Sequence, residues 1–254
     1  MPGDPERYSM EGLEQAIAKV GGMAQDDARE KEMRTSFNLK KSGGRHDVDA
    51  YLDLKGPLIP AALEGQRVEF ELKSVTARTP AIGTSRDVGL AHLQKWRKLH
   101  WLFGIYGQDD TGEMVLQYCL YGSPQKMAAW FDEKTAYIAA DIRLAEYVPD
   151  LLTDETLTAV VGQQEQFTLA QAKALMKNQY SALEYSAAAD LDDEMLSRVA
   201  MLSILRSRAR YVILRGATLN NPKIPKSYFE GWEKITEDHA SRLRELVVES
   251  LQTT

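Results

Sequence analysis

The sequence predicts an α/β chain, more closely α+β, in which a mixed central sheet precedes a mostly helical C-terminal half. Three observations predict this class. Residues 68–75 alternate apolar and charged side chains, which is the period of a half-buried strand. Residues 101–106 and 115–121 are apolar runs joined by a turn at Gln-Asp-Asp-Thr-Gly, which predicts a hairpin. The stretch from 124 to about 208 has helical character.

The elements before the central strand are predicted from spacing and from breaks. Apolar residues at helical spacing predict a helix over 10–20, which ends at two glycines. A polar helix follows over about 24–36, and residues 40–44 form a loop. The first strand is expected over 46–54, where Lys-Gly-Pro ends it.

The central strand is predicted to be two-sided. Val68, Phe70 and Leu72 would face a core, and Glu69, Glu71 and Lys73 would share the opposite face, since side chains alternate across a strand. An irregular loop is expected over 76–85. A helix from Leu90 to Trp101 follows, with Trp96 and Leu99 on its core side.

The second half is predicted to be helical with few exceptions. Pro124 begins a helix after the capping residue Ser123, and breaks fall near 149, 162 and 190–193. Residues 211–214 are either a strand or a helix end, 220–226 form a loop, and a helix covers about 228–251. We expect residues 1–123 to form one core and 124–254 a mainly helical region. No clear linker separates the two, so the alternative is that both are parts of one domain.

Composition excludes several classes of protein. The chain has 254 residues with 44 % hydrophobic content, enough to bury a core. No run approaches the roughly 18 apolar residues of a membrane span, and the first residues lack a signal-peptide stretch. The single cysteine, Cys119, excludes an internal disulfide and is expected to be buried in a reducing compartment. A cytoplasmic protein without a membrane partner is expected.

Charge is segregated along the chain, although the net charge is −6. Between Arg198 and Lys226 there are basic residues and no acidic ones. Between Arg67 and Lys98, basic residues also outnumber acidic ones. A local basic groove is therefore compatible with an acidic total.

The residues that suggest chemistry are Glu71 and Lys73, two positions apart on the central strand. A Glu-x-Lys pair is common on solvated sheet faces and is a weak signal alone. Two acids on the preceding predicted strand, Asp47 and Asp49, and a basic helix that follows strengthen it. The pair would lie about 7 Å apart along the strand, near enough to reach one phosphate. The combination predicts a metal-dependent phosphodiesterase site.

This pattern resembles the PD-(D/E)xK nuclease superfamily, and within it a type II restriction endonuclease. The resemblance covers residues about 10–121 and depends on Asp49 and on the run Glu71-Leu72-Lys73-Ser74. It implies a restriction-endonuclease-like αβββαβ core around the mixed sheet.

The chain departs from the family pattern at the first acid, because no proline precedes it. The choice between Asp47 and Asp49 is therefore open. Asp49 is favoured because it follows a β-branched residue and lies seven residues before Gly56, and Asp53 is the third choice.

The resemblance also implies roles. Asp49 and Glu71 would bind Mg²⁺, with the Leu72 carbonyl as a third ligand. Lys73 would lower the pKa of the attacking water and offset charge on the phosphate. Glu69 shares the face and would orient Lys73 or hold a second ion. A glutamate of the first helical region, Glu30 or as second choice Glu14, is a further candidate.

DNA contacts are expected outside this site. The alternation from Arg206 to Arg210 does not fall on one helical face and suits an extended segment or a helix end; ordinary pairing with a helix dipole or with the acids at 192–194 is the alternative. His92 and His100 are expected to be structural. The candidate DNA-binding residues are Arg78, Arg86, Lys95, Lys98, Arg206, Arg208, Arg210, Asn220, Asn221 and Lys223.

The resemblance predicts a Mg²⁺-dependent, sequence-specific endonuclease of double-stranded DNA that acts as a homodimer, because palindromic sites imply two-fold symmetry. The helical half would supply DNA recognition and the dimer surface. A structure-selective nuclease of repair or recombination is the alternative among enzymes. An inactive DNA-binding or interaction module is the alternative outside enzymes.

Overall fold

The computed structural model describes residues 27–43, 48–57 and 59–253. The helix expected over 10–20, and with it Glu14, lies outside these residues, as do His46 and Asp47. The chain divides into two compact units. Of the described residues, the first unit takes those up to Ser85, Gln94–Phe131 and those from Asn221 onward, and the second takes Arg86–Leu93 and Asp132–Asn220. The chain thus leaves the first unit and returns to it.

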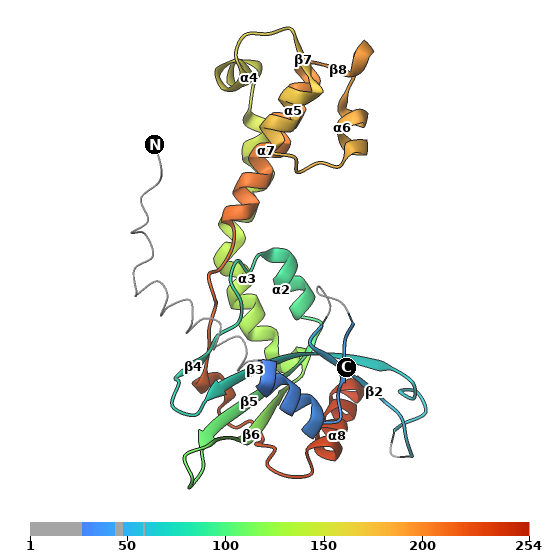
Figure 1. The fold of residues 1–254 in the computed structure, drawn as a ribbon, viewed down its shortest axis with the longest axis vertical. Coiled ribbons are helices and arrows are strands. Elements are labelled where there is room, and N and C mark those ends of the chain that lie inside the picture. The colour runs from blue at the N-terminus through green and yellow to red at the C-terminus, as the bar shows by residue number, and fades with distance from the viewer. Residues whose placement is uncertain (1–26, 44–47, 58, 254) are drawn as a thin grey trace, which may run out of the picture. The chain divides into compact units, whose positions relative to one another are not determined.

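The first unit is built on a mixed five-stranded sheet, so the α+β expectation is confirmed (Figure 1). β3 and β5 are parallel, and the other neighbouring pairs are antiparallel. In the order of the sheet, the strands are β1 (Lys40–Lys41), β2 (Ala50–Asp53), β3 (Arg67–Thr76), β5 (His100–Gln108) and β6 (Met114–Gly122).

One face of this sheet holds the main core. Val68, Phe70 and Leu72 are buried there, as the alternation in β3 predicted. The helix over residues 27–36 contributes Met33, and α8 (His239–Gln252) contributes Leu243. Both helices lie against the sheet in Figure 1. Helices from both ends of the described chain thus pack on the same face of the sheet as these β3 side chains.

The opposite face is covered by aromatic side chains. Trp101 of β5 lies 5.9 Å, ring to ring, from Phe131 of α3 (Pro124–Tyr147). Phe103 lies 4.8 Å from Phe229, which belongs to the 3₁₀ turn η3 (Lys226–Phe229). As expected, α3 begins at Pro124, and Ser123 caps it by accepting the Lys126 N–H at 3.2 Å.

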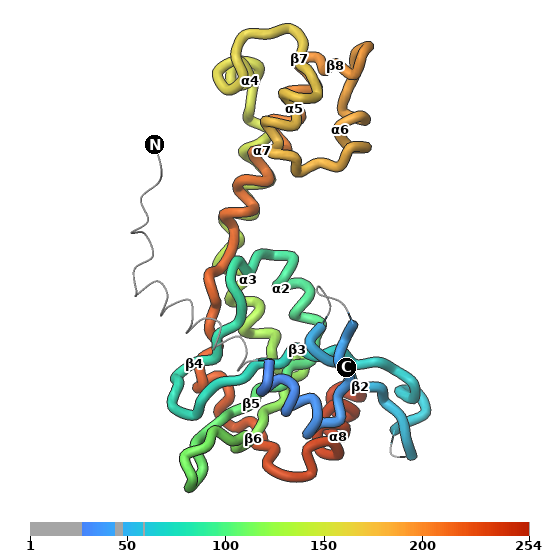
Figure 2. Tube along the Cα trace, viewed as in Figure 1, coloured from blue at the N-terminus to red at the C-terminus, as the bar shows by residue number. Residues whose placement is uncertain are grey.

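The second unit is mainly helical, and Figure 2 follows the chain through it. Its core contains Leu157, Phe167, Leu196 and Ile204. Three of its helices begin with a reciprocal capping box. Besides the later part of α3, it contains η1 (Val148–Leu151), α4 (Asp154–Val161), β7 (Gln166–Thr168), α5 (Leu169–Met176), α6 (Ala182–Ala188), η2 (Asp192–Glu194), β8 (Met195–Ser197) and α7 (Arg198–Gly216).

Several boundaries differ from the predictions. Residues 211–214 and 206–210 lie inside the continuous helix α7, so the extended alternative is wrong. The helix expected over 228–251 is α8 alone, because Gly231 and Asp238 have left-handed backbone conformations that interrupt helical geometry. α2 (Leu90–Trp96) is shorter than expected, since β5 begins at His100.

Short strands account for the other differences. Lys40–Lys41 pairs with β2 although a loop was expected. β4 (Ala81–Ile82) lies in the segment predicted as a loop and pairs with β9 (Ile224–Pro225). β7 and β8 pair with each other inside the region predicted as helical. Within the described ranges, no helix combines the length and apolar character needed to cross a bilayer.

Candidate active site

The site lies where β2 and β3 stop pairing. Their ladder runs from Asp53 opposite Arg67 to Ala50 opposite Phe70, whereas β3 continues to Thr76 along β5. The edge of β3 that faced β2 is therefore open from residue 71 onward. Leu72 N–H donates to Asp49 Oδ2 at 2.8 Å at this point. A carboxylate thus replaces the backbone acceptor that a longer β2 would have supplied.

One ammonium group lies among three oxygen atoms at this edge. Lys73 Nζ is 2.6 Å from Glu71 Oε1 and 3.7 Å from Asp49 Oδ2. It also donates to the carbonyl oxygen of Leu72 at 3.0 Å. Asp49, Glu71, Lys73 and the Leu72 carbonyl, which the sequence predicted to work together, are therefore neighbours around one position that holds a cation.

Burial makes the charges of this site interact strongly. Glu71 is 8 % exposed, and the Lys73 side chain is 17 % exposed. Burial raises the pKa of Glu71; the Lys73 ammonium opposes this shift and the Asp49 carboxylate adds to it. Burial alone would lower the pKa of Lys73, but the charges of Glu71 and Asp49 outweigh it and the pKa is raised. Lys73 is therefore held as a cation.

Glu30 adds a third carboxylate from the helix over 27–36. Burial raises the pKa of Glu30, and the charge of Asp49 raises it further, while Lys73 and Arg34 oppose the shift. Arg34 lies 3.6 Å from Glu30 as an ion pair one turn along the helix. Glu30, one of the two glutamates considered from the sequence, is thus within electrostatic range of the site.

The donor atoms fit a hard divalent cation. Carboxylate and carbonyl oxygens are the ligands that Mg²⁺ prefers. Among the described residues, no three acidic, histidine or cysteine side chains form a metal-binding group. The fit therefore depends on two carboxylates and the Leu72 carbonyl, around the position that the Lys73 ammonium now takes.

The other acids considered for the site lie differently. Asp53 accepts a hydrogen bond from Lys40 Nζ at 2.7 Å and lies 3.5 Å from Arg67, at the far end of β2. Glu69 is exposed. Among the described acids in or beside β2, Asp49, which immediately precedes the strand, is therefore the one that contacts Lys73.

The predicted DNA-binding residues of the first unit are largely on its surface. Arg78, Lys95, Lys98 and Lys223 are exposed. Lys95 is near enough to Glu71 for its charge to lower the pKa of that carboxyl group. Asn221 has a structural role, because its Oδ1 accepts the Thr84 N–H at 2.9 Å.

In the second unit, two of the arginines predicted to bind DNA donate hydrogen bonds to backbone carbonyls of other segments. Arg206 donates to the Leu152 carbonyl at 2.8 Å, and Arg210 donates to the Ala145 carbonyl at 3.2 Å. The Arg208 guanidinium lies 5.3 Å from the centre of the Tyr211 ring. Arg86 and Asn220 are exposed.

His100 and Cys119 are buried inside the sheet. His100 Nδ1 hydrogen bonds to the Tyr121 hydroxyl at 2.6 Å, and burial lowers the pKa of His100 to about 4. Burial raises the pKa of the Cys119 thiol. The burial of Cys119 is as the sequence predicted.

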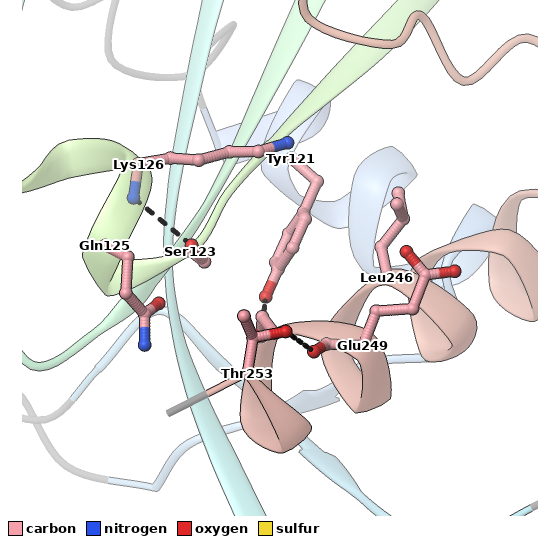
Figure 3. Close-up of a pocket in the computed structure, with 8 residues that line it drawn as sticks. Tyr121, Ser123, Gln125, Lys126, Leu246, Glu249 and Thr253 are labelled. Carbon is pink, nitrogen blue, oxygen red and sulfur yellow. Dashed lines mark hydrogen bonds between the residues drawn. The ribbon is translucent and has the colours of Figure 1, made fainter.

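A separate hollow of about 260 Å³ lies between the start of α3 and the end of α8 (Figure 3). Its polar groups bind one another: the Tyr121 hydroxyl lies 2.9 Å from Ser250 Oγ, and Ser123 Oγ accepts the Lys126 N–H. The first bond joins β6 to α8 and the second caps α3, so these polar groups serve to hold the fold together.

Tyr106 contacts the helix that carries Glu30, which the sequence did not indicate. Its hydroxyl donates to Glu32 Oε2 at 3.0 Å, on the same helix as Glu30. An aromatic residue at the end of an apolar strand is ordinary core material, so no pattern in the sequence marked Tyr106.

No known family model and no curated protein sequence matches the chain.

Proposed function

We propose that the protein is a Mg²⁺-dependent endonuclease of double-stranded DNA, with a site like that of the PD-(D/E)xK nucleases and a sequence preference like that of type II restriction enzymes. One observation carries the proposal. Asp49, immediately before β2, and the Glu-x-Lys of β3 surround a single cation position at an open strand edge. The mixed sheet supports a restriction-endonuclease-like core.

Each residue has a role that its geometry suits. Asp49 Oδ and Glu71 Oε, with the Leu72 carbonyl, would hold the cation. Bound Mg²⁺ supplies Lewis-acid chemistry, which polarises a phosphoryl oxygen and favours ionisation of water. Lys73 Nζ would turn toward a non-bridging phosphate oxygen and offset the charge that develops there. Glu30, whose pKa is raised, suits proton acceptance from the attacking water.

Incubation with bacteriophage DNA and Mg²⁺ tests this proposal. Discrete fragments support a sequence-specific endonuclease, and EDTA should abolish them. A smear supports a nuclease without sequence preference, and cleavage confined to junctions or flaps supports the structure-selective alternative. Intact DNA under all of these conditions contradicts the enzyme and favours an inactive binding module.

Matched variants assign any cleavage to this site. Glu71→Gln and Lys73→Ala should each lower the cleavage rate by a factor of about 10² or more, with DNA binding retained. Glu64→Gln and Lys55→Ala change exposed side chains of the same unit and should leave the rate unchanged. Equal rates in all four variants would place the activity elsewhere. Sedimentation with and without DNA tests the expected homodimer.

A further inference from the structure

A hollow of about 410 Å³ lies where the parallel strands β3 and β5 end. We call it the strand-end pocket. In open α/β sheets, ligands commonly bind outside the carboxyl ends of parallel strands, and β3 and β5 form the parallel pair of this mixed sheet. Its walls include Thr76 and Arg78 after β3, Tyr106 and Gln108 of β5, and Met114 and Gln117 of β6.

A β-bulge aims one side chain at this pocket. Ile105 pairs with Tyr118 and Tyr106 pairs with Leu116, so Gln117 is the extra residue between them. Bulges redirect side chains and are frequent beside active sites. A Cβ atom on Gly107 would lie 2.0 Å from Gln117 Nε2. The amide group therefore lies against the Gly107 backbone, in the space that a larger residue at 107 would take from it.

The polar groups of the pocket are available to a ligand. Arg78, Gln108 and Gln117 are exposed. Within the described ranges, their side chains take part in no hydrogen bond or ion pair, and no acid lines the pocket. An amide that donates and accepts matches the edge of adenine, and a guanidinium matches O6 and N7 of guanine. This chemistry suits base edges.

The pocket is joined to the active site by two elements. Thr76 follows Lys73 by three residues on β3, a distance of about 10 Å. Base pairs rise about 3.4 Å each, so a duplex cut at Lys73 would present bases about three steps away. The helix over 27–36 carries Glu30 at the site and Glu32, which binds the Tyr106 wall.

We infer that the strand-end pocket is a base-recognition subsite, in which Gln117 and Arg78 contact base edges of duplex DNA beside the cleaved phosphate. This inference rests on the proposed endonuclease function. On this inference, the DNA sequence preference comes from Gln117 and Gln108 of the strand-end pocket in addition to Arg78, which lies in the loop after β3.

Selection from a duplex library with a randomised centre tests the inference, with Ca²⁺ in place of Mg²⁺ to measure binding apart from cleavage. The unmodified protein should enrich one sequence. Gln117→Ala and Arg78→Ala should each lose selection at one or two positions. Affinity for the enriched duplex should fall tenfold or more, as expected for loss of a bidentate base contact, and affinity for an unrelated duplex by less than threefold. Gln252→Ala and Lys55→Ala are the matched controls.

Two outcomes overturn the subsite while leaving the endonuclease in place. In one, both variants enrich the same sequence as the unmodified protein with unchanged affinity. In the other, they weaken binding to all sequences equally, which is the behaviour of a phosphate contact. Failure of the endonuclease itself looks different: the unmodified protein would enrich nothing and leave phage DNA intact in Mg²⁺, and the subsite would fall with it.

Discussion

Leu72 donates its backbone hydrogen to Asp49 Oδ2 at 2.8 Å, while its carbonyl oxygen accepts from Lys73 Nζ at 3.0 Å. The backbone of one residue is thus bonded to two of the proposed functional side chains. The end of β2 leaves these backbone groups without a strand partner, and the site side chains take its place. The Asp49 carboxylate and the Lys73 ammonium therefore satisfy backbone hydrogen bonds of the fold and also belong to the proposed site.

Substitution of Asp49 should separate these two contributions. Asparagine keeps an oxygen that can accept the Leu72 N–H, so Asp49→Asn should change the free energy of unfolding by less than about 1 kcal/mol. Asp49→Ala leaves that N–H without its partner and should cost about 1–3 kcal/mol. Both variants should lower cleavage about 10²-fold or more. Urea denaturation and a phage-DNA cleavage assay measure the two effects.

The matched control is Asp53→Asn, at the end of β2 farther from Asp49. Asp53 contacts Lys40 and Arg67, so cleavage should be unaffected. Loss of cleavage in Asp53→Asn with retention in Asp49→Asn would show that the first acid of the site was assigned wrongly.

Lys73→Met should show whether the ammonium group and a divalent cation compete for the position among the site oxygen atoms. Removing one partner of a buried ion pair leaves uncompensated charge, and we expect a loss of about 3 kcal/mol at neutral pH. Millimolar Mg²⁺ should then raise the unfolding temperature of Lys73→Met more than that of the unmodified protein, because the ammonium no longer takes the position among the oxygens. Differential scanning calorimetry with and without Mg²⁺ measures this difference. Lys55→Met is the control, and equal shifts in all three proteins would argue against a metal at these oxygens.

The sequence predicted β3 almost to the residue because its two faces differ so sharply. Val68, Phe70 and Leu72 are apolar toward one core, and charged residues alternate with them. The same alternation suggested that Glu71 and Lys73 would be solvated, whereas both are largely buried. At the site, Lys73 contacts Asp49 and feels the charge of Glu30, and both of these acids are distant from it in sequence. Alternation within one strand carries no information about such contacts.

Other parts of the fold were not predictable from local patterns. β7 and β8 have three residues each, too few to show a period of two. Asp238 adopts a left-handed conformation immediately before α8, in a sequence that is otherwise compatible with helix. Arg206 and Arg210 alternate in sequence but lie on one continuous helix, where carbonyl oxygens of preceding segments accept from them. Tertiary contacts decided each of these cases.

His100 should make stability depend on pH in a defined window. Its pKa is lowered to about 4 by burial, from about 6.5 in the unfolded chain. The unfolded state therefore binds a proton first as the pH falls. The contribution of His100 is complete above pH 6.5 and is lost progressively toward pH 4, by about 3 kcal/mol in total.

His100→Gln removes this titration and keeps a group that can hydrogen bond to Tyr121. The variant should be less stable at pH 7, but the decrease in its unfolding free energy between pH 7 and 5 should be smaller. Comparing urea denaturation of the two proteins across this range cancels the opposite contributions of Glu30 and Glu71, whose pKa values are raised. Parallel pH profiles would contradict a neutral, buried imidazole.

Gly107→Ala should disturb the strand-end pocket without unfolding the sheet. The added Cβ would lie 2.0 Å from Gln117 Nε2, and that flexible amide can move away. The backbone of Gly107 is not left-handed, so alanine adds no strain there, and stability should change by less than about 1 kcal/mol. Sequence preference in duplex selection should weaken as it does in Gln117→Ala. Gly216→Ala, whose added Cβ would meet no atom within 4 Å, is the control.

If Gly107 acts only by making room for the Gln117 amide, Gly107→Ala combined with Gln117→Ala should match Gln117→Ala alone. Additive losses in the double variant would show that Gly107 contributes in another way, and an unchanged preference in Gly107→Ala would mean that the position of the amide does not matter.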